Sequence, residues 1–381
     1  MNITTIRSVW KVAAFTAVAT LTLTSCAASN ATDNAVAGSP FVAERQTNIP
    51  GAVLPENRVL WQYDKSVGSY SEVDGDASTY TPSLIAPEGE VTIAYMDPWA
   101  SNPFAIPIRE GVEKYAKDLG FTLIYCDTQF LPDKAVSCAE MLADQQPDFA
   151  IAGNWQGGAA AAVIEVFNEA RIPTNSIDVV HPNSIFFGAD NYTSGAIAGT
   201  AAGNYAKQTW SCEDVWLVLG ESKQEGEAAD QRLVGFADGV QGVCGTIPAN
   251  QIARVLMLAG TADQAITSTT DWMTANPQAT NLLGLSLDDE RSSGMAKAFV
   301  ASDRPGMIVG LGCDTVGVAV IKQAKASENR YLGCTAFFPE LYASYLVSIA
   351  LDVISGEPVP NEVHLEHTFL TNDTVEGVYP N

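Results

Sequence analysis

The sequence of 381 residues has few positive charges. It contains 20 Lys and Arg against 44 Asp and Glu, which gives a formal net charge of −24, and its basic residues are scattered singly. A surface of this sign repels phosphate backbones, which nucleic-acid-binding proteins must attract. We therefore expect no nucleic-acid partner.

Catalytic and metal-binding motifs are also missing. The chain has no G-x-S-x-G, H-E-x-x-H, P-loop or C-x-x-C motif. His364 and His367 have the spacing of a helical metal pair, but they lie in a segment predicted to be extended, so we expect surface residues rather than zinc ligands. Three aspartates could act as acids or bases, but no nucleophile is recognisable near them: Asp178, Asp288 and Asp314. We predict no enzyme, no metal and no cofactor.

Long apolar runs are absent after the N-terminus. Residues 12–23 are apolar, follow two basic residues, and are too short to cross a bilayer, which needs about 20 residues. They have the character of an export signal. Residues 23–26 (LTSC) resemble the lipobox of bacterial lipoproteins, which predicts a signal peptide over 1–25 and a lipid on Cys26. The alternative is an ordinary secretory signal with a chance cysteine.

Cysteine usage agrees with export. Six cysteines remain besides Cys26, and an even number in an exported chain suggests three disulfides. Spacing alone leaves the pairing open. We favour pairs of sequence neighbours, namely Cys126–Cys138, Cys212–Cys244 and Cys313–Cys334. Buried free thiols are the alternative, less expected outside the cell.

Residues 26–88 form a linker and an N-terminal extension. Residues 27–40 are small and polar, which is typical of a flexible spacer. Residues 41–90 hold Trp61, Tyr63, Tyr70 and Tyr80, which suggests that part of this segment packs against the folded body.

From Val91 onward, predicted strands and helices alternate. Strands are predicted at 91–96, 121–125, 149–152, 172–177, 185–189, 215–220, 253–258, 282–287, 307–311 and 331–336. Helices are predicted at 104–119, 134–145, 157–170, 193–208, 228–241, 263–275, 290–302, 315–326 and 339–355. Alternation of this kind predicts parallel α/β sheets. The strands outnumber a single sheet of about 4–6 strands, so we predict two doubly wound lobes with a break near residue 190.

The first strand–helix–strand unit, residues 91–125, indicates where a ligand binds. Open α/β sheets bind ligands beyond the carboxyl ends of their strands. The loop after the first strand carries two aromatic rings and an amide, those of Trp99, Phe104 and Asn102. This loop is expected to form one side of a small-ligand site.

Several short motifs, in order along residues 90–370, resemble the type I periplasmic binding proteins, and the ribose-binding group in particular. They are Ser101-Asn102-Pro103-Phe104, Arg171-Ile172-Pro173 with Asp178, Gly188-Ala189-Asp190-Asn191 with Gly195 and Gly199, Arg232-Leu233-Val234-Gly235-Phe236, Asp288-Asp289-Glu290 with Gly294, Cys313-Asp314, and Ser355-Gly356-Glu357-Pro358. Each is weak alone, but their shared order makes the resemblance specific.

The resemblance implies two doubly wound lobes joined by a three-segment hinge near Asp190, Phe337 and residues 362–366. The first lobe would comprise 90–189 and 338–364, and the second 190–337 and 365–381. The protein would be a monomeric, membrane-anchored receptor outside the cytoplasmic membrane. It would close over a sugar or polyol and deliver it to an ABC permease. A sensor that reports ligand to a membrane signalling protein is an alternative.

The resemblance also implies the ligand-binding residues: Trp99, Asn102, Phe104, Asn154, Trp155, Asp178, Asn191, Arg232, Asp288, Asp314 and Phe337. Other roles stay open for some of them. The tryptophans could pack on the lobe surface, Phe104 could staple its helix, and Arg232 could form a surface ion pair. Of two adjacent carboxylates, we assign Asp288 to the ligand and Asp289 to the helix cap.

Several positions depart from the ribose-type pattern. Val179 replaces an arginine, Asp288 an asparagine, Cys313 a phenylalanine, and Phe337 a residue that is often glutamine. One arginine facing three carboxylates disfavours an acidic ligand. We therefore expect a neutral sugar or polyol, with an amine-bearing molecule as the alternative.

Overall fold

The computed structural model describes residues 52–53, 58–77 and 80–380. The predicted signal peptide, Cys26 and the spacer lie outside these residues. Within the described part of the chain, no helix combines the length and apolar character needed to cross a membrane.

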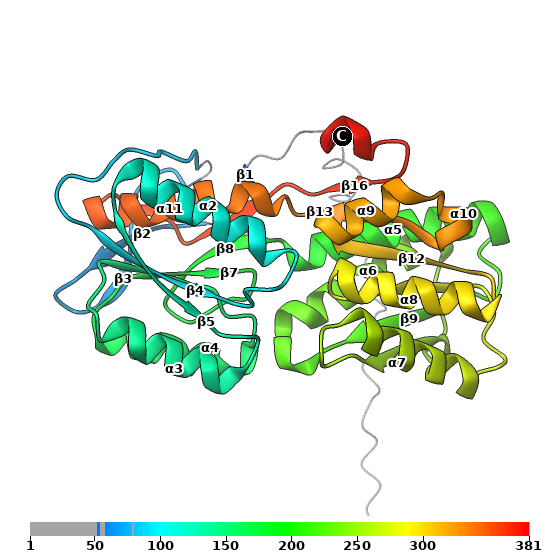
Figure 1. Cartoon of the computed structure of the whole chain (residues 1–381). Coiled ribbons are helices and arrows are strands. Elements are labelled where there is room, and N and C mark those ends of the chain that lie inside the picture. The colour runs from blue at the N-terminus through cyan, green and yellow to red at the C-terminus, as the bar shows by residue number, and fades with distance from the viewer. Residues whose placement is uncertain (1–51, 54–57, 78–79, 381) are drawn as a thin grey trace, which may run out of the picture. The chain divides into compact units, whose positions relative to one another are not determined.

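The first lobe is built on a seven-stranded sheet with the order β1-β15-β8-β7-β6-β4-β5. Its strands are β1 (Ala52–Val53), β4 (Thr92–Asp97), β5 (Thr122–Asp127), β6 (Phe149–Ala152), β7 (Thr174–Ile177), β8 (Ile185–Ala189) and β15 (Glu362–Leu365). All neighbours are parallel except β1 and β15. Helices α2 (Ala105–Leu119) and α11 (Pro339–Ser355) lie on one face of the sheet, and α3 (Pro132–Ala143) and α4 (Ala160–Glu169) on the other (Figure 1).

The second lobe is built on a six-stranded sheet with the order β10-β9-β11-β12-β13-β16. Its strands are β9 (Trp216–Glu221), β10 (Ile252–Leu256), β11 (Leu282–Leu285), β12 (Gly306–Gly312), β13 (Tyr331–Ala336) and β16 (Thr368–Leu370), of which only β16 is antiparallel. Its helices are α5 (Asn191–Trp210), α6 (Glu227–Cys244), α7 (Ala262–Ala275), α8 (Asp289–Ser302), α9 (Thr315–Gln323), α10 (Ala326–Asn329) and α12 (Val375–Val378). Single 3-10 turns occur at Gly157–Ala159, Lys223–Glu225 and Ala249–Gln251.

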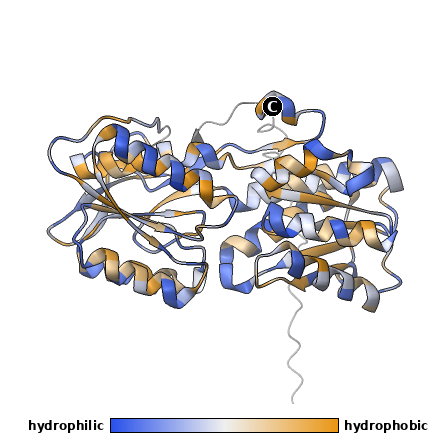
Figure 2. Cartoon of the chain, in the orientation of Figure 1, coloured by the Kyte–Doolittle hydropathy of each residue, from blue (hydrophilic) through white to orange (hydrophobic). Residues whose placement is uncertain are grey.

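Apolar strands and amphipathic helices account for the core. Every residue of β6, β11 and β12 is buried, as expected for parallel strands covered on both faces. In α2, Ile108 and Val112 face the core, while its polar residues face outward. Figure 2 shows the same division, with hydrophobic strands inside and mixed helices around them.

Helices α5 and α6 approach closely because glycines line their contact. A Cβ at Gly199 would lie 2.1 Å from the carbonyl oxygen of Phe236, and a Cβ at Gly239 would lie 2.3 Å from that of Ala196. Larger side chains would push the helices apart. This packing sets the position of Arg232, which α6 carries toward the site described below.

Each predicted strand between residues 91 and 336 is present. The predicted helix at 315–326 is wrong in its last turn, because the chain extends at Ala324 before α10 begins. The Asn329 side-chain amide donates to the backbone carbonyl oxygens of Val320 and Ala324. These two carbonyl groups at the end of α9 therefore have hydrogen-bond partners. The short strands outside this range were not predicted.

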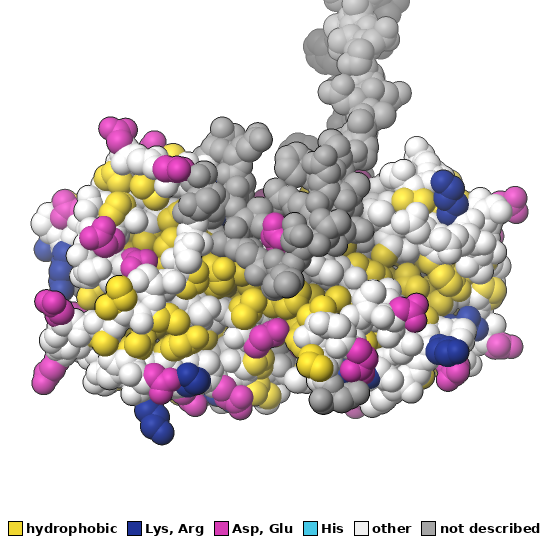
Figure 3. Space-filling model, turned by 90° about the horizontal axis from the view of Figure 1, so that it is seen from above, with side chains coloured by type: hydrophobic (Ala, Val, Ile, Leu, Met, Phe, Trp, Pro, Cys, Tyr) yellow, Lys and Arg dark blue, Asp and Glu magenta, His cyan; other side chains and the backbone are white. Residues whose placement is uncertain are grey.

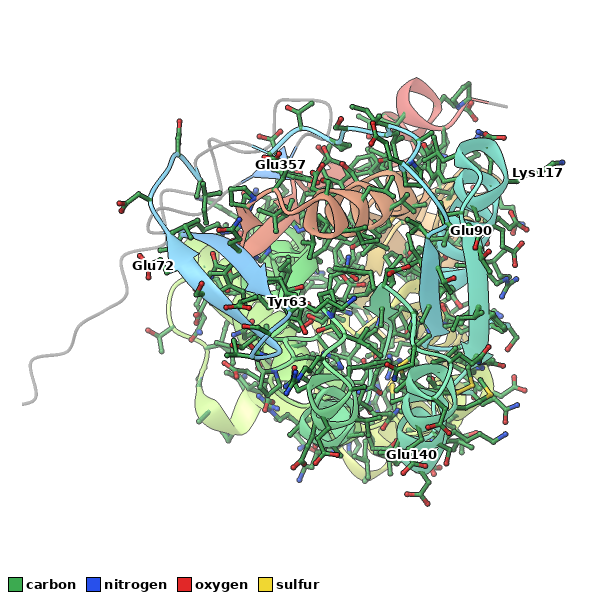
Figure 4. All side chains as sticks on the ribbon, turned by 90° about the vertical axis from the view of Figure 1, so that its left-hand side faces the viewer. Tyr63, Glu72, Glu90, Lys117, Glu140 and Glu357 are labelled. Atoms are coloured by element: carbon green, nitrogen blue, oxygen red, sulfur yellow. A yellow bond between two sulfur atoms is a disulfide. The ribbon has the colours of Figure 1, made fainter. Side chains whose placement is uncertain are left out.

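Part of the N-terminal extension packs against the first lobe, as its aromatic residues suggested. Strands β2 (Leu60–Asp64) and β3 (Ser69–Val73) form a hairpin that pairs with β14 (Val359–Pro360). The hydroxyl of Tyr70 donates to the carbonyl of Thr174, and that of Tyr80 to Asp352. Figure 4 shows the hairpin on this side of the molecule, with Tyr63 and Glu72 labelled.

The chain passes between the two sheets three times within the described residues, and His367 touches all three crossings. These lie at Asp190 between β8 and α5, at Phe337 between β13 and α11, and at His367 between β15 and β16. The Asp190 amide donates to His367 Nε2 (3.0 Å), and Nδ1 lies 3.1 Å from the carbonyl oxygen of Ala336. The expectation of a surface residue is wrong for His367, which is 2% exposed.

Among the described residues there are three disulfides, and they join the sequence neighbours that we favoured. Cys126 in β5 bonds Cys138 in α3, and Cys212 bonds Cys244 at the end of α6. The third joins Cys313, just after β12, to Cys334 in β13.

Candidate functional site

A cavity of about 560 Å³, including the part open to solvent, lies where loops from both lobes meet. The lining residues come from loops and helix starts that follow the carboxyl ends of strands. They are Trp99, Asn102, Phe104, Phe130, Trp155, Asp178, Val179, Glu225, Ala228, Arg232, Leu287, Asp288, Arg291, Leu311, Gly312 and Phe337.

The Trp99 loop is fixed by a buried carboxylate at the end of β4. Asp97 accepts hydrogen bonds from the amide of Trp99 (3.0 Å) and from Arg109 Nη1 (3.0 Å), and Arg109 also donates to the carbonyl of Ala100. Burial raises the pKa of Asp97. The Trp99 ring stacks on Phe130, with centroids 5.2 Å apart and an angle of 13°. The loop therefore presents a supported aromatic surface to the cavity.

Phe104 joins the aromatic residues of the site. Its ring lies 6.0 Å from Trp155, 6.0 Å from Phe337 and 5.5 Å from Tyr342, measured between centroids. Asn102 Oδ1 accepts from the amide of Phe104, which holds the start of α2 against this cluster. The ring is thus a wall of the cavity as well as a packing element at a helix start.

Asp178 brings a carboxylate to the cavity from a left-handed backbone conformation (φ 59°) just after β7. One oxygen, Oδ1, accepts from the Ala189 amide (2.9 Å) and from the Tyr342 hydroxyl (2.8 Å). Burial raises the pKa of Asp178, and the nearby positive charge of Arg232 opposes that rise. The structure therefore holds one oxygen firmly and leaves Oδ2 without a hydrogen bond to any described residue.

Arg232 reaches the cavity from α6 and is held in place by two hydrogen bonds. Its Nε donates to Asn191 Oδ1 (2.7 Å) and its Nη1 to the carbonyl of Leu287 (2.8 Å). The guanidinium lies 5.2 Å from the centre of the Phe337 ring, a favourable cation–π arrangement. Its Nη2 makes no hydrogen bond within the described chain. A surface ion pair, the alternative role for this residue, is not what the structure shows.

Arg291 is a buried arginine of the site that the sequence analysis did not identify. Its Nε and Nη2 donate to Asp288 Oδ2 (2.8 and 2.5 Å), and its Nη1 donates to Glu225 Oε1 (2.8 Å). The two carboxylates raise the pKa of Arg291 against the lowering effect of burial. The expectation of one arginine facing three carboxylates is therefore wrong, since two arginines line the cavity with Asp178, Glu225 and Asp288.

The assignment of the helix cap to Asp289 is also wrong. Asp288 is the N-cap of α8, and its Oδ1 accepts from the amide of Arg291. Asp289 is fully buried and accepts from the amide of Asp314 and the hydroxyl of Tyr331. The register of α8 begins one residue earlier than expected, so Asp288 both caps the helix and lines the cavity.

Three of the predicted ligand-binding residues lie behind the cavity lining, because their side chains bond to the protein itself. Asn154 bonds within its own loop and to His181. Asn191 bridges the carbonyl of Asp178 and Arg232. Asp314 caps α9 through the amides of Val316 and Gly317, and burial raises its pKa to about 6. These residues position the lining rather than form it.

Eight predicted residues do line the cavity: Trp99, Asn102, Phe104, Trp155, Asp178, Arg232, Asp288 and Phe337. The others of the lining were not predicted as ligand contacts: Phe130, Val179, Glu225, Ala228, Leu287, Arg291, Leu311 and Gly312. Val179, Leu287 and Gly312 lie at or just past strand ends, so the rule on carboxyl ends could have found them. Within the described residues, no group of His, Cys, Asp or Glu is placed to hold a metal ion.

Comparison with known proteins places this architecture in a family. The chain is 24% identical over 277 residues to the ribose import binding protein of Salmonella typhimurium, covering 70% of this chain and 86% of that protein. Two solved proteins of Mycobacterium smegmatis share the fold. One, an ABC transporter solute-binding protein with bound glycerol, has a TM-score of 0.64 and 17% identity, over 77% of this chain and 98% of that one.

The second of these Mycobacterium smegmatis proteins was solved in complex with β-D-fucofuranose. It has a TM-score of 0.62 and 20% identity, over 76% of this chain and 94% of that one. The family described as periplasmic binding protein domain matches residues 93–358, which include every residue of the cavity lining. The chain is therefore a member of the periplasmic binding protein family.

Proposed function

We propose that the protein is the solute receptor of an ABC importer and that it binds a neutral sugar in the cavity between its lobes. One observation carries the proposal, namely the combination of aromatic rings with fixed charged groups. Aromatic faces cover the C–H faces of a sugar ring. Hydroxyl groups pair well with charged partners, and Asp178 and Arg232 offer one unpaired oxygen and one unpaired nitrogen.

The charges of the lining support a neutral ligand. Three carboxylates and two arginines line the cavity, and Arg291 is already paired with Asp288 and Glu225. A phosphate or sugar acid would meet a surplus of negative charge. The names of the relatives agree with this choice, since one is a ribose import protein and one was solved with β-D-fucofuranose.

Capture would proceed by closure of the two lobes about the three crossings at Asp190, Phe337 and His367. The closed receptor would then dock on a membrane permease. A lipid on Cys26 would keep the monomeric receptor at the outer side of the cytoplasmic membrane. Figure 3 shows Lys and Arg side chains scattered among Asp and Glu side chains on one face of the molecule.

Calorimetric titration tests the proposal. Neutral pentoses and hexoses are expected to bind, and sugar acids and sugar phosphates are not. Binding of sugar phosphates without binding of neutral sugars would contradict it. Small-angle scattering with saturating sugar is expected to show compaction, and an unchanged radius of gyration would contradict closure.

A further inference from the structure

Two contacts between the lobes, both at the rim of the cavity, depend on glycine. At the first, Gly157 in the turn after β6 faces the turn between β9 and α6. A Cβ at Gly157 would lie 2.9 Å from the carbonyl oxygen of Glu225 and 3.2 Å from the Cα of Gly226. Because a separation below 3.0 Å from a backbone atom forces something to shift, only glycine lets these two turns lie so close together.

The second contact joins Trp99 of the first lobe to Gly260, which follows β10 in the second lobe. A Cβ at Gly260 would lie 3.0 Å from Cζ3 of Trp99 and 3.8 Å from Cε1 of Phe130. Gly226 and Gly260 both have a positive φ (68° and 69°), a backbone conformation that favours glycine. The second lobe therefore presents bare backbone at both contacts.

On the first-lobe side, Trp99 and Gly157 belong to one braced rim. The Trp99 ring stacks on Phe130, and the carbonyl oxygen of Phe130 accepts from Nε2 of Gln156 (3.0 Å). Gln156 is buried and directly precedes Gly157. The ring stack and this buried hydrogen bond hold the two contact points in place relative to each other.

On the second-lobe side, Arg291 braces the opposite rim. Its Nη1 donates to Glu225 Oε1 (2.8 Å) and lies 3.5 Å from the carbonyl oxygen of Met257. Glu225 directly precedes Gly226, and Met257 lies three residues before Gly260. The two rims that face each other across the cavity are thus each held by buried side chains.

We propose that Gly157, Gly226 and Gly260 set how far the lobes close, and thereby set the ligand affinity without touching the ligand. None of the three lines the cavity. This inference rests on the proposed capture by closure and deepens it. The apparent affinity of a receptor falls with the fraction of molecules that can reach the binding-competent form. A side chain wedged between the rims would lower that fraction and leave every lining residue unchanged.

Gly157→Ala and Gly158→Ala are a matched pair that tests the first contact. Neither glycine has a positive φ, and a Cβ at Gly158 would meet nothing within 4 Å. Calorimetry uses whichever of D-ribose, D-glucose and D-galactose the wild type binds most tightly. Gly157→Ala is expected to weaken binding roughly 10-fold, because a methyl group inserted into a packed contact destabilises the closed form. Gly158→Ala is expected to bind like the wild type.

A second pair tests the contact with Trp99. Gly260→Asn places a side chain against the ring, and asparagine tolerates a left-handed backbone. Gly120→Asn is its control, because Gly120 also has a positive φ (79°) and open space around it. Gly260→Asn is expected to weaken binding by a similar factor, and thermal melting without sugar checks that all four variants fold.

Binding kinetics give a readout besides affinity. In stopped-flow fluorescence, Gly157→Ala is expected to release the sugar faster and to capture it at the rate of the wild type. The reason is that the lining residues met by the sugar are the same, while the closed form that retains it is less stable. An affinity loss that arises from slower capture alone would contradict the proposal.

The outcomes separate this inference from the proposed function. Unchanged affinity in both Gly157→Ala and Gly260→Asn, or equal losses in their controls, overturns the role of the glycines and leaves sugar binding intact. A wild type that binds sugar without compaction in small-angle scattering overturns closure, and this inference with it. The absence of binding to any neutral sugar overturns the proposed function itself.

Discussion

Acid is expected to weaken the hinge through the buried imidazole of His367. Its Nδ1 must carry the proton, because it faces the carbonyl oxygen of Ala336, and its Nε2 must be free to accept from the amide of Asp190. Only the neutral ring can make both bonds. A second proton on Nε2 would point at an N–H group and break the link between two crossings of the chain.

The pKa of His367 sets the size and the sign of the effect. Burial lowers this pKa from 6.5 to about 4, with His364 and Arg232 adding to the fall and Asp190 and the carbonyl of Ala336 opposing it. At a pH between about 4 and 6.5, His367 is protonated in the unfolded chain but not in the folded chain. The free energy of unfolding therefore decreases as the pH falls. At about 1.4 kcal/mol per pH unit, the free energy of unfolding decreases by about 2 kcal/mol between pH 7 and 5. The decrease reaches about 3 kcal/mol near pH 4.

Urea unfolding of the wild type and of His367→Asn, followed by tryptophan fluorescence at several pH values, isolates this contribution. The variant cannot titrate here, so the stability advantage of the wild type is expected to shrink by about 2 kcal/mol from pH 7 to 5. His181 is a second buried histidine, with its pKa lowered by burial to about 4. Because His181 is present in the wild type and in the variant, its contribution cancels in the difference between their free energies of unfolding. An advantage that stays constant with pH would refute the role assigned to the imidazole of His367.

Three further substitutions test the site, the packing and the anchor. Asp178→Asn is expected to weaken sugar binding roughly 10- to 100-fold in calorimetry, because it removes a charged acceptor; unchanged affinity would place the ligand elsewhere. Gly239→Ala is expected to destabilise the fold by about 1–3 kcal/mol in urea unfolding, because its Cβ would meet the backbone of α5. Gly242→Ala in the same helix has open space around it and is the control; equal losses would contradict the packing account. Cys26→Ser is expected to release the protein from the membrane fraction of its host, and retention there would count against a lipid anchor.

Local patterns were sufficient to predict most of the elements. Apolar runs of strand length and amphipathic helices alternate from Val91 to Ala336, and this alternation implies parallel sheets whatever the tertiary contacts. The short strands β2, β3, β14 and β16 were missed, because they are stabilised by pairing with distant segments. The break between α9 and α10 was missed because it depends on the side chain of Asn329.

The site was predicted in part, and its main omission has a physical cause. Trp99, Asn102 and Phe104 follow a strand directly, so their sequence position places them at the rim of the sheet. Arg291 and Glu225 lie on different elements of the second lobe, and only folding brings them together. No local pattern distinguishes a solvent-exposed arginine from one that is buried between two carboxylates.

The sequence by itself determined the class of fold and the acidic composition, and it predicted an export signal and a ligand-binding loop, because these inferences depend on composition and on short-range periodicity. The tertiary structure decided which side chains have unpaired atoms in the cavity. It also decided that His367 joins the three crossings, and that Asp314 and Asn154 bond to the protein itself. Hydrogen-bond satisfaction is a property of neighbours in space, and those neighbours are residues far apart along the chain.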